Sequence, residues 1–109
     1  MPGEKTSKRP SGPITIKVNP RIDGIVRSYL EHRKQDMDSL LLALEDGEFE
    51  RIRSVAHDLV GTGGSFGFKH MSIVGRSLEN AAKGRKSEEI KILLEGLAEY
   101  LSRVEVVPE

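Results

Sequence analysis

Four stretches of the chain carry apolar residues at the three- and four-residue spacing of an α-helix, and only short connections separate them. The apolar positions, in four groups, are Ile22, Ile25, Val26, Tyr29, Leu30, Met37, Leu40, Leu41 and Leu44; Phe49, Ile52, Val55, Ala56 and Leu59; Met71, Val74, Leu78 and Ala81; and Ile90, Leu93, Leu94, Leu97, Leu101 and Val104. Helices joined by short connections pack against their neighbours in the sequence. The sequence therefore predicts an all-α fold, an antiparallel up-down four-helix bundle.

Residues around the first stretch indicate where its helix begins and ends. Asn19 is typical of an N-cap and Pro20 of a first helical position. Gly47 supplies the left-handed conformation that often follows a last turn. The polar residues 31–36 interrupt the apolar face, so two arrangements stay open for residues 20–46. They form either one helix or a short N-terminal capping helix followed by a longer one.

The later helices have similar boundary signals. The second helix is expected over about residues 48–62, where it runs into a glycine-rich segment, and the third is expected to end near Gly84. Ser87 is a candidate N-cap for the last helix, because acidic residues are favourably placed in the turn that follows it. Pro108 is expected to close that last helix.

The N-terminal segment differs from the rest of the chain. Residues 1–13 are polar and rich in Gly, Pro, Ser and Lys, so they are expected to form a disordered tail or linker. Ile14–Val18 then alternates apolar and polar residues, which is the period of a strand. No second strand pattern is found for this segment to pair with. We therefore expect an extended N-terminal arm laid against a single helical bundle domain that spans residues 14–109.

Composition excludes several classes of function. Among 109 residues, 17 basic side chains balance 17 acidic ones, which gives no electrostatic case for binding nucleic acid or an anionic membrane. The chain has no cysteine, so disulfides and thiolate metal sites are excluded. No apolar run approaches the roughly 20 residues that span a bilayer, and no secretory signal pattern is present. We therefore expect a cytoplasmic protein without a cofactor.

The segment from Ala56 to Phe68 carries the clearest chemical signal. At about 100° per residue, His57 falls about 140° from the middle of the apolar sector of its helix, so its ring should face solvent. Gly61 lies one turn later on the same face, where a missing side chain leaves room for another molecule to approach the imidazole. An exposed imidazole is partly neutral near neutral pH, so a nucleophilic form is available. His57 is therefore a candidate nucleophile, and the alternative is a solvated histidine beside a frayed helix end.

This segment resembles the signature of histidine-containing phosphotransfer (HPt) domains, which is Ala-His-x-Leu-Lys-Gly, then five residues, then Gly. Ala56, His57, Leu59, Gly61 and Gly67 match that signature at the same spacing. The Asp-Gly-Glu-Phe turn before the histidine helix and the apolar stretch after it are also similar to the family. The resemblance therefore extends over most of the chain.

The resemblance implies a four-helix bundle that serves as a histidine phosphocarrier in a two-component phosphorelay. His57 would accept a phosphoryl group from the aspartyl phosphate of a response-regulator receiver domain and pass it to another receiver aspartate. The receiver would supply Mg²⁺ and the catalytic machinery, so the bundle would be a carrier and not an enzyme. The implied partners are receiver domains, with a hybrid histidine kinase as a further candidate.

One position departs from the family pattern. The family usually has Lys three residues after the histidine, where it lies beside the imidazole, and this chain has Val60 there. Arg53 lies one turn before His57 on the same face and is a candidate substitute for the missing charge, with an ordinary solvated Arg as the alternative. Arg53, Val60, Gly61 and Gly64 are expected to belong to the partner-docking surface around His57.

Other kinds of site fit the sequence less well. The glycines between residues 61 and 67 are neither preceded by a strand nor followed by Gly-Lys-Ser/Thr, as a phosphate-binding loop requires. The three histidines form no pair at one-turn spacing with an acidic partner, so no metal site is expected. Arg76 and Glu79 are interpreted as part of a solvated face, with a position in the neighbourhood of His57 as the alternative for Arg76. The alternative function is a helical interaction or dimerisation module that docks receivers or kinases without phosphotransfer.

Overall fold

The computed structural model describes residues 12–109, which form four α-helices and two short strands. In chain order the elements are β1 (Ile14–Val18), the 3₁₀ turn η1 (Pro20–Ile22), α2 (Asp23–Glu45), α3 (Phe49–Ser65), α4 (Lys69–Lys83), α5 (Ser87–Arg103) and β2 (Val104–Pro108). The four helices confirm the prediction of a mostly helical fold with four helices, whereas the pair of strands was not expected. The tail predicted for residues 1–13 lies outside the described residues, apart from the exposed Gly12 and Pro13.

The first long helix begins as its capping residues indicate. The side chain of Asn19 accepts a hydrogen bond from the backbone N–H of Arg21 at 2.9 Å, and Pro20 occupies the first position of η1. This turn runs directly into α2, which continues unbroken through the polar residues 31–36. Gly47 then adopts a φ of +70°, as predicted from its place after the last turn. The leading element is thus one turn joined to a single long helix.

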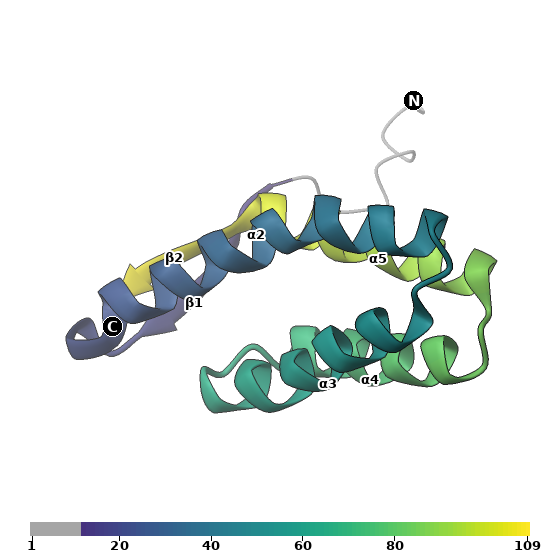
Figure 1. Ribbon diagram of the computed structural model, residues 1–109. Coiled ribbons are helices and arrows are strands. Elements are labelled where there is room, and N and C mark those ends of the chain that lie inside the picture. Colours follow the sequence, from purple (N-terminus) through teal and green to yellow (C-terminus); the bar gives the residue numbers. More distant parts are fainter. Residues whose placement is uncertain (1–11) are drawn as a thin grey trace, which may run out of the picture.

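The helices form two layers around an aliphatic core. Figure 1 shows α2 and α5 together in one layer and α3 and α4 in the other. Each helix contacts the next one along the chain, and α5 also contacts α2. Among the described residues no polar or charged residue is buried. The largest fully buried side chains, all but Phe68 from the predicted apolar stripes, are those of Phe68, Leu40, Ile52, Leu59, Met71, Leu78, Ile90, Leu94, Leu97, Leu101 and Val26.

None of the helices within residues 12–109 combines the length and apolar character that crossing a membrane requires.

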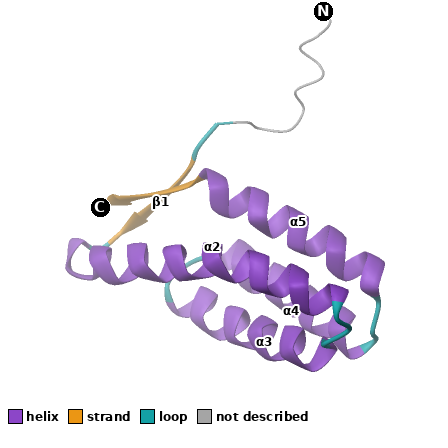
Figure 2. Ribbon diagram, turned by 45° about the horizontal axis from the view of Figure 1, so that its top comes forward, coloured by secondary structure: helices purple, strands orange, loops and turns teal. Residues whose placement is uncertain are grey.

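The two ends of the described chain meet in a parallel two-stranded sheet, at the end of the bundle where α2 begins and α5 ends (Figure 2). The register pairs Ile14 with Val104 and continues to Pro108. The expectation of an unpaired arm was therefore wrong, and so was the extension of the last helix, because α5 ends at Arg103. Val104 follows Leu101 at helical spacing, so its position in the pattern did not separate helix from strand. Parallel pairing between distant segments leaves no local signal in the sequence.

Two helix boundaries also differ from the prediction. α3 continues beyond Thr62 and includes the next two glycines. The turn that follows ends at Gly67, which has a φ of +83°. Glycine is a poor helix former, but here the backbone of α3 packs against α4 and tertiary contacts outweigh that preference. At the other boundary, Ser87 is the first residue of α5. Lys86 stands at the N-cap, and no side chain caps this helix with a hydrogen bond.

Close contact between α3 and α4 depends on Gly75. A Cβ atom at Gly75 would lie 3.0 Å from the Cβ of Leu59 and 3.1 Å from the backbone oxygen of Ala56. Neither atom can give way unless α3 itself moves, so a glycine is needed for this approach. The hydroxyl of Ser72 donates a hydrogen bond to the backbone oxygen of Val60 at 2.9 Å, which fixes one helix along the other.

Replacing Gly75 with alanine should lower the free energy of unfolding by about 1 kcal/mol, because overpacking costs roughly 1–3 kcal/mol and better helix propensity returns about 1 kcal/mol. Urea denaturation measures the change. Gly61→Ala is the matched control, since a Cβ at Gly61 meets no atom within 4 Å. That control should leave stability unchanged or slightly raised. Equal stability of the two variants would contradict the close-contact argument.

Candidate functional site

His57 lies in α3 with its side chain turned to solvent. The side chain is 72% exposed, whereas Ala56 and Leu59 on the same helix are fully buried. The contrast follows from the helical period, which directs neighbouring residues to different faces. The prediction that the ring of His57 faces solvent is therefore confirmed.

α4 supplies a carboxylate partner for this ring. Oε2 of Glu79 lies 3.2 Å from Nδ1 of His57, and the side chain of Glu79 is only 17% exposed. The interpretation of Glu79 as part of a solvated face was therefore wrong, whereas Arg76 is exposed as expected. His57 and Glu79 stand at nearly equal sequence distances on either side of the Gly67 turn. Helices that fold back on each other bring such residues level, and this symmetry was the signal that could have found Glu79.

The contact between His57 and Glu79 constrains the imidazole chemically. An ionised carboxylate can only accept hydrogen bonds, so a hydrogen bond between these two atoms requires the hydrogen to be on Nδ1. In the neutral ring with that tautomer, Nε2 bears the lone pair, and it has no hydrogen-bond partner among residues 12–109. The arrangement therefore presents an oriented nucleophilic nitrogen to solvent. Among residues 12–109, no group of three or more His, Asp or Glu residues is placed to hold a metal ion.

The two glycines assigned to the docking surface, Gly61 and Gly64, lie on the same side of α3 as His57. A Cβ atom at Gly61 would meet nothing within 4 Å, so the space one turn after the imidazole is open. A Cβ at Gly64 would lie 3.5 Å from the hydroxyl oxygen of Ser72, which is an ordinary van der Waals contact with α4. Gly61 thus leaves room beside His57, while Gly64 lies at the edge of the α3–α4 contact.

Val60 belongs to the contact between α3 and α4. Its side chain is half-buried, and its Cγ2 would lie 3.2 Å from a Cβ atom at Gly75. The aliphatic side chain therefore fills the space that glycine leaves on α4. This packing gives a physical role to the residue that departs from the expected pattern, and an aliphatic side chain there supplies no charge beside His57.

Arg53 lies one turn before His57 and is paired with an acidic residue of its own helix. Its Nη2 and Nε donate to Oε1 of Glu50 at 2.9 and 3.1 Å. The hydrogen bond and the charge of Arg53 lower the pKa of Glu50, and the same pair raises the pKa of Arg53. Arg53 thus lies one helical turn from His57, but its guanidinium is bound to Glu50. Glu50 is a residue that the sequence did not single out.

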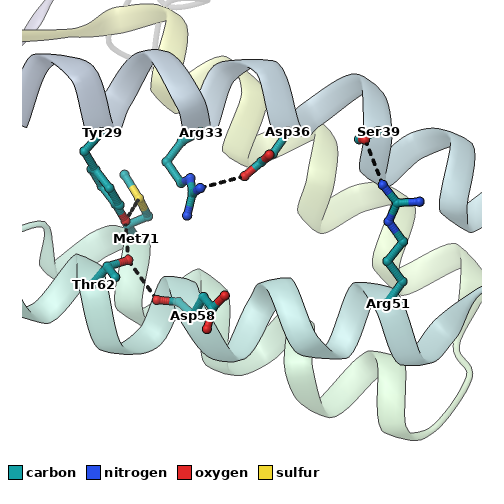
Figure 3. Close-up of polar contacts among 8 residues, drawn as sticks. All are labelled: Tyr29, Arg33, Asp36, Ser39, Arg51, Asp58, Thr62 and Met71. Atoms are coloured by element: carbon teal, nitrogen blue, oxygen red, sulfur yellow. Dashed lines mark hydrogen bonds and ion pairs between the residues drawn. The ribbon is translucent and has the colours of Figure 1, made fainter.

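Polar contacts tie α2 to the side of α3 shown in Figure 3. The hydroxyl of Tyr29 lies 2.7 Å from the hydroxyl of Thr62. Further along, Nη2 of Arg51 reaches across to the hydroxyl of Ser39 at 3.2 Å. Arg51 and Arg53 are close in sequence but have different partners, because alternate positions of a helix face different directions.

A protein-family model described as the Hpt domain matches residues 24–106 of the chain. The match includes α3 and α4 in full, and therefore His57, Glu79 and the glycines between them. No curated protein and no solved structure matches the chain.

Replacing Glu79 with alanine should change the tautomer of His57. With the carboxylate present, the neutral ring is expected to carry its hydrogen on Nδ1, and without it the hydrogen should move in large part to Nε2. Two-bond ¹⁵N–¹H correlations of the imidazole measure the two populations. Glu95→Ala removes an exposed carboxylate from α5 and is the control. A tautomer that is the same in the wild type and in Glu79→Ala would show that Glu79 does not orient the ring.

Proposed function

Because the chain belongs to the Hpt domain family, we propose that it carries a phosphoryl group on His57. Hpt domains are histidine phosphotransfer modules of phosphorelays, and they are phosphocarriers rather than catalysts. The observation that supports His57 as the acceptor is its exposed imidazole, which contacts Glu79 through Nδ1 and leaves Nε2 open to a partner. The antiparallel up-down arrangement of the helices is part of the same proposal, and the short turns and closed ring of helix contacts support it.

The proposed step is a displacement at phosphorus. The lone pair of Nε2 attacks the phosphorus of an aspartyl phosphate on a receiver domain and forms the N–P bond. The bond from phosphorus to the aspartyl oxygen breaks, and its electron pair stays on the released carboxylate. Nδ1 keeps its hydrogen, so the phosphorylated ring gains positive character that the Glu79 carboxylate offsets. The reverse step transfers the phosphoryl group to another receiver aspartate.

Receiver domains and kinases are the partners of Hpt domains in two-component systems. We propose that a receiver docks around His57 and brings the Mg²⁺ and the catalytic machinery, because phosphoryl transfer needs positioning and charge neutralisation. Gly61 supports this proposal, since the open space beside it lets a partner approach Nε2. Arg53, Val60 and Gly64 are proposed to lie at the border of the same docking surface. A hybrid histidine kinase is a further candidate source of the phosphoryl group.

Replacing His57 with glutamine should abolish labelling of the chain by ³²P-phosphorylated receiver domains. Because the residue is exposed, the free energy of unfolding of the variant should differ from that of the wild type by no more than about 0.5 kcal/mol. The label on the wild type should be labile in acid and stable in base, as expected of a phosphorus–nitrogen bond. His32→Gln and His70→Gln remove the other exposed histidines and should keep the label.

Label that persists on the His57→Gln variant would contradict the assignment. Binding of receivers to the wild-type chain without any label would favour the alternative, a helical interaction module that docks partners without phosphotransfer.

Replacing Gly61 with glutamine should slow transfer by crowding the approach to Nε2, while stability stays the same or rises, since glutamine is the better helix former. Gly96→Gln is the matched control, because Gly96 is a helical glycine of α5 whose Cβ would also meet nothing within 4 Å. Rapid-quench measurement of label transfer compares the two variants. Equal transfer rates would show that the open space at Gly61 has no part in docking.

A further inference from the structure

We propose that Arg53 exchanges partners during the phosphotransfer cycle, leaving Glu50 for the phosphoryl group on His57. In the unphosphorylated chain, Glu50 binds the guanidinium and keeps it from other partners. This inference rests on the proposed function of His57. It adds a residue that stabilises the phosphorylated form of His57, and it names the side chain that supplies the positive charge in place of a lysine at position 60.

The geometry places Arg53 between its two partners on one helix face. Glu50 lies about one turn before Arg53, and His57 lies one turn after it. Side chains at these spacings are neighbours on the helix surface, about 5–6 Å apart at Cβ. Arginine has a long side chain, so a change of rotamer can move its guanidinium from the first partner to the second. No backbone movement is needed.

The pair with Glu50 is suited to being exchanged. Nε and Nη2 of Arg53 both donate to the single oxygen Oε1, and the side chain of Glu50 is 84% exposed. Exposed ion pairs of this kind add little to stability because water and salt screen them. A phosphoryl group brings about two negative charges and three acceptor oxygens, which a guanidinium can bind in bidentate fashion. The new partner is therefore the stronger one.

The negative charge of Glu79 favours the same movement. Its carboxylate contacts Nδ1 of His57 at 3.2 Å, and it adds to the effect of Glu50 in raising the pKa of Arg53. Glu79 therefore lies close enough for its charge to act on Arg53. The guanidinium would meet the phosphoryl oxygens beside a carboxylate, so its move also relieves repulsion between that carboxylate and the new anion.

The other basic side chains near the start of α3 contact different partners. Arg51 contacts Glu48 and Ser39 on another side of α3, and Arg85 lies over the ring of Phe49 at 4.7 Å. On α4, Arg76 and Lys83 lie about one turn to either side of Glu79 and are the competing candidates. The experiment must therefore separate Arg53 from these two residues.

The test is a double-mutant cycle on the lifetime of the label on His57. Wild type, Arg53→Ala, Glu50→Gln and the double variant are phosphorylated with a ³²P-labelled receiver, separated from it, and followed as the label is lost. Arg53→Ala should lose its label about threefold faster, and Glu50→Gln about twofold more slowly, as expected for exposed charge contacts. The double variant should decay like Arg53→Ala, because Glu50 acts only through Arg53.

Matched controls keep the result specific. Arg51→Ala and Glu48→Gln remove the neighbouring pair on another side of α3 and should leave the lifetime unchanged. Val60→Lys in the Arg53→Ala background should restore it, because a lysine there supplies the absent charge.

Three outcomes would overturn the partner exchange. Equal lifetimes in all variants would do so while leaving His57 as the acceptor. Slower decay in Glu50→Gln that persists without Arg53 would show that Glu50 acts by its own charge. Faster decay in Arg76→Ala or Lys83→Ala, with no change in Arg53→Ala, would assign the role to α4. A wild-type chain that takes no label would overturn the proposed function itself and this inference with it.

Discussion

The close contact of α3 with α4 is the constraint on which the site depends. Gly75 allows the two backbones to approach, and the hydrogen bond from Ser72 to Val60 sets their register. A shift of one residue along this contact would rotate the side chains of α4 by about 100° relative to α3. The position of Glu79 beside His57 is therefore a consequence of how two helices pack. It does not depend on a loop.

This packing gives an exposed residue a defined chemical state. An imidazole in free solution exchanges between tautomers, and a carboxylate fixed on a neighbouring helix selects one of them. His57 is both accessible and oriented, which are conflicting demands for a surface side chain with free rotamers. Glu79 meets the second demand because packing against its neighbours leaves only 17% of its own side chain exposed. The charges near the imidazole come from Glu79 on α4 and from the Arg53–Glu50 pair on α3.

The sheet closes the other end of the fold. Val18 of β1 and Val106 of β2 are both buried, so the strands add to the core that the helices form. Arg27 of α2 donates to the backbone oxygen of Val106 at 2.7 Å and links the first long helix to the last strand. The segments before α2 and after α5 are thereby held together. The site on α3 and α4 lies in the other layer (Figure 1).

The sequence by itself determined the helices, most of the buried positions and the exposure of His57, because these follow from a period of 3.6 residues that is written locally. It also indicated the family, through residues that lie close together in the chain. Only the tertiary structure decided that Glu79 contacts His57, that Glu50 holds Arg53, and that β1 pairs with β2. The first and last join segments far apart in the chain, and the second depends on which rotamer a long side chain adopts. Periodicity carries no information about either, because distant pairing and rotamer choice are settled by packing and charge in three dimensions.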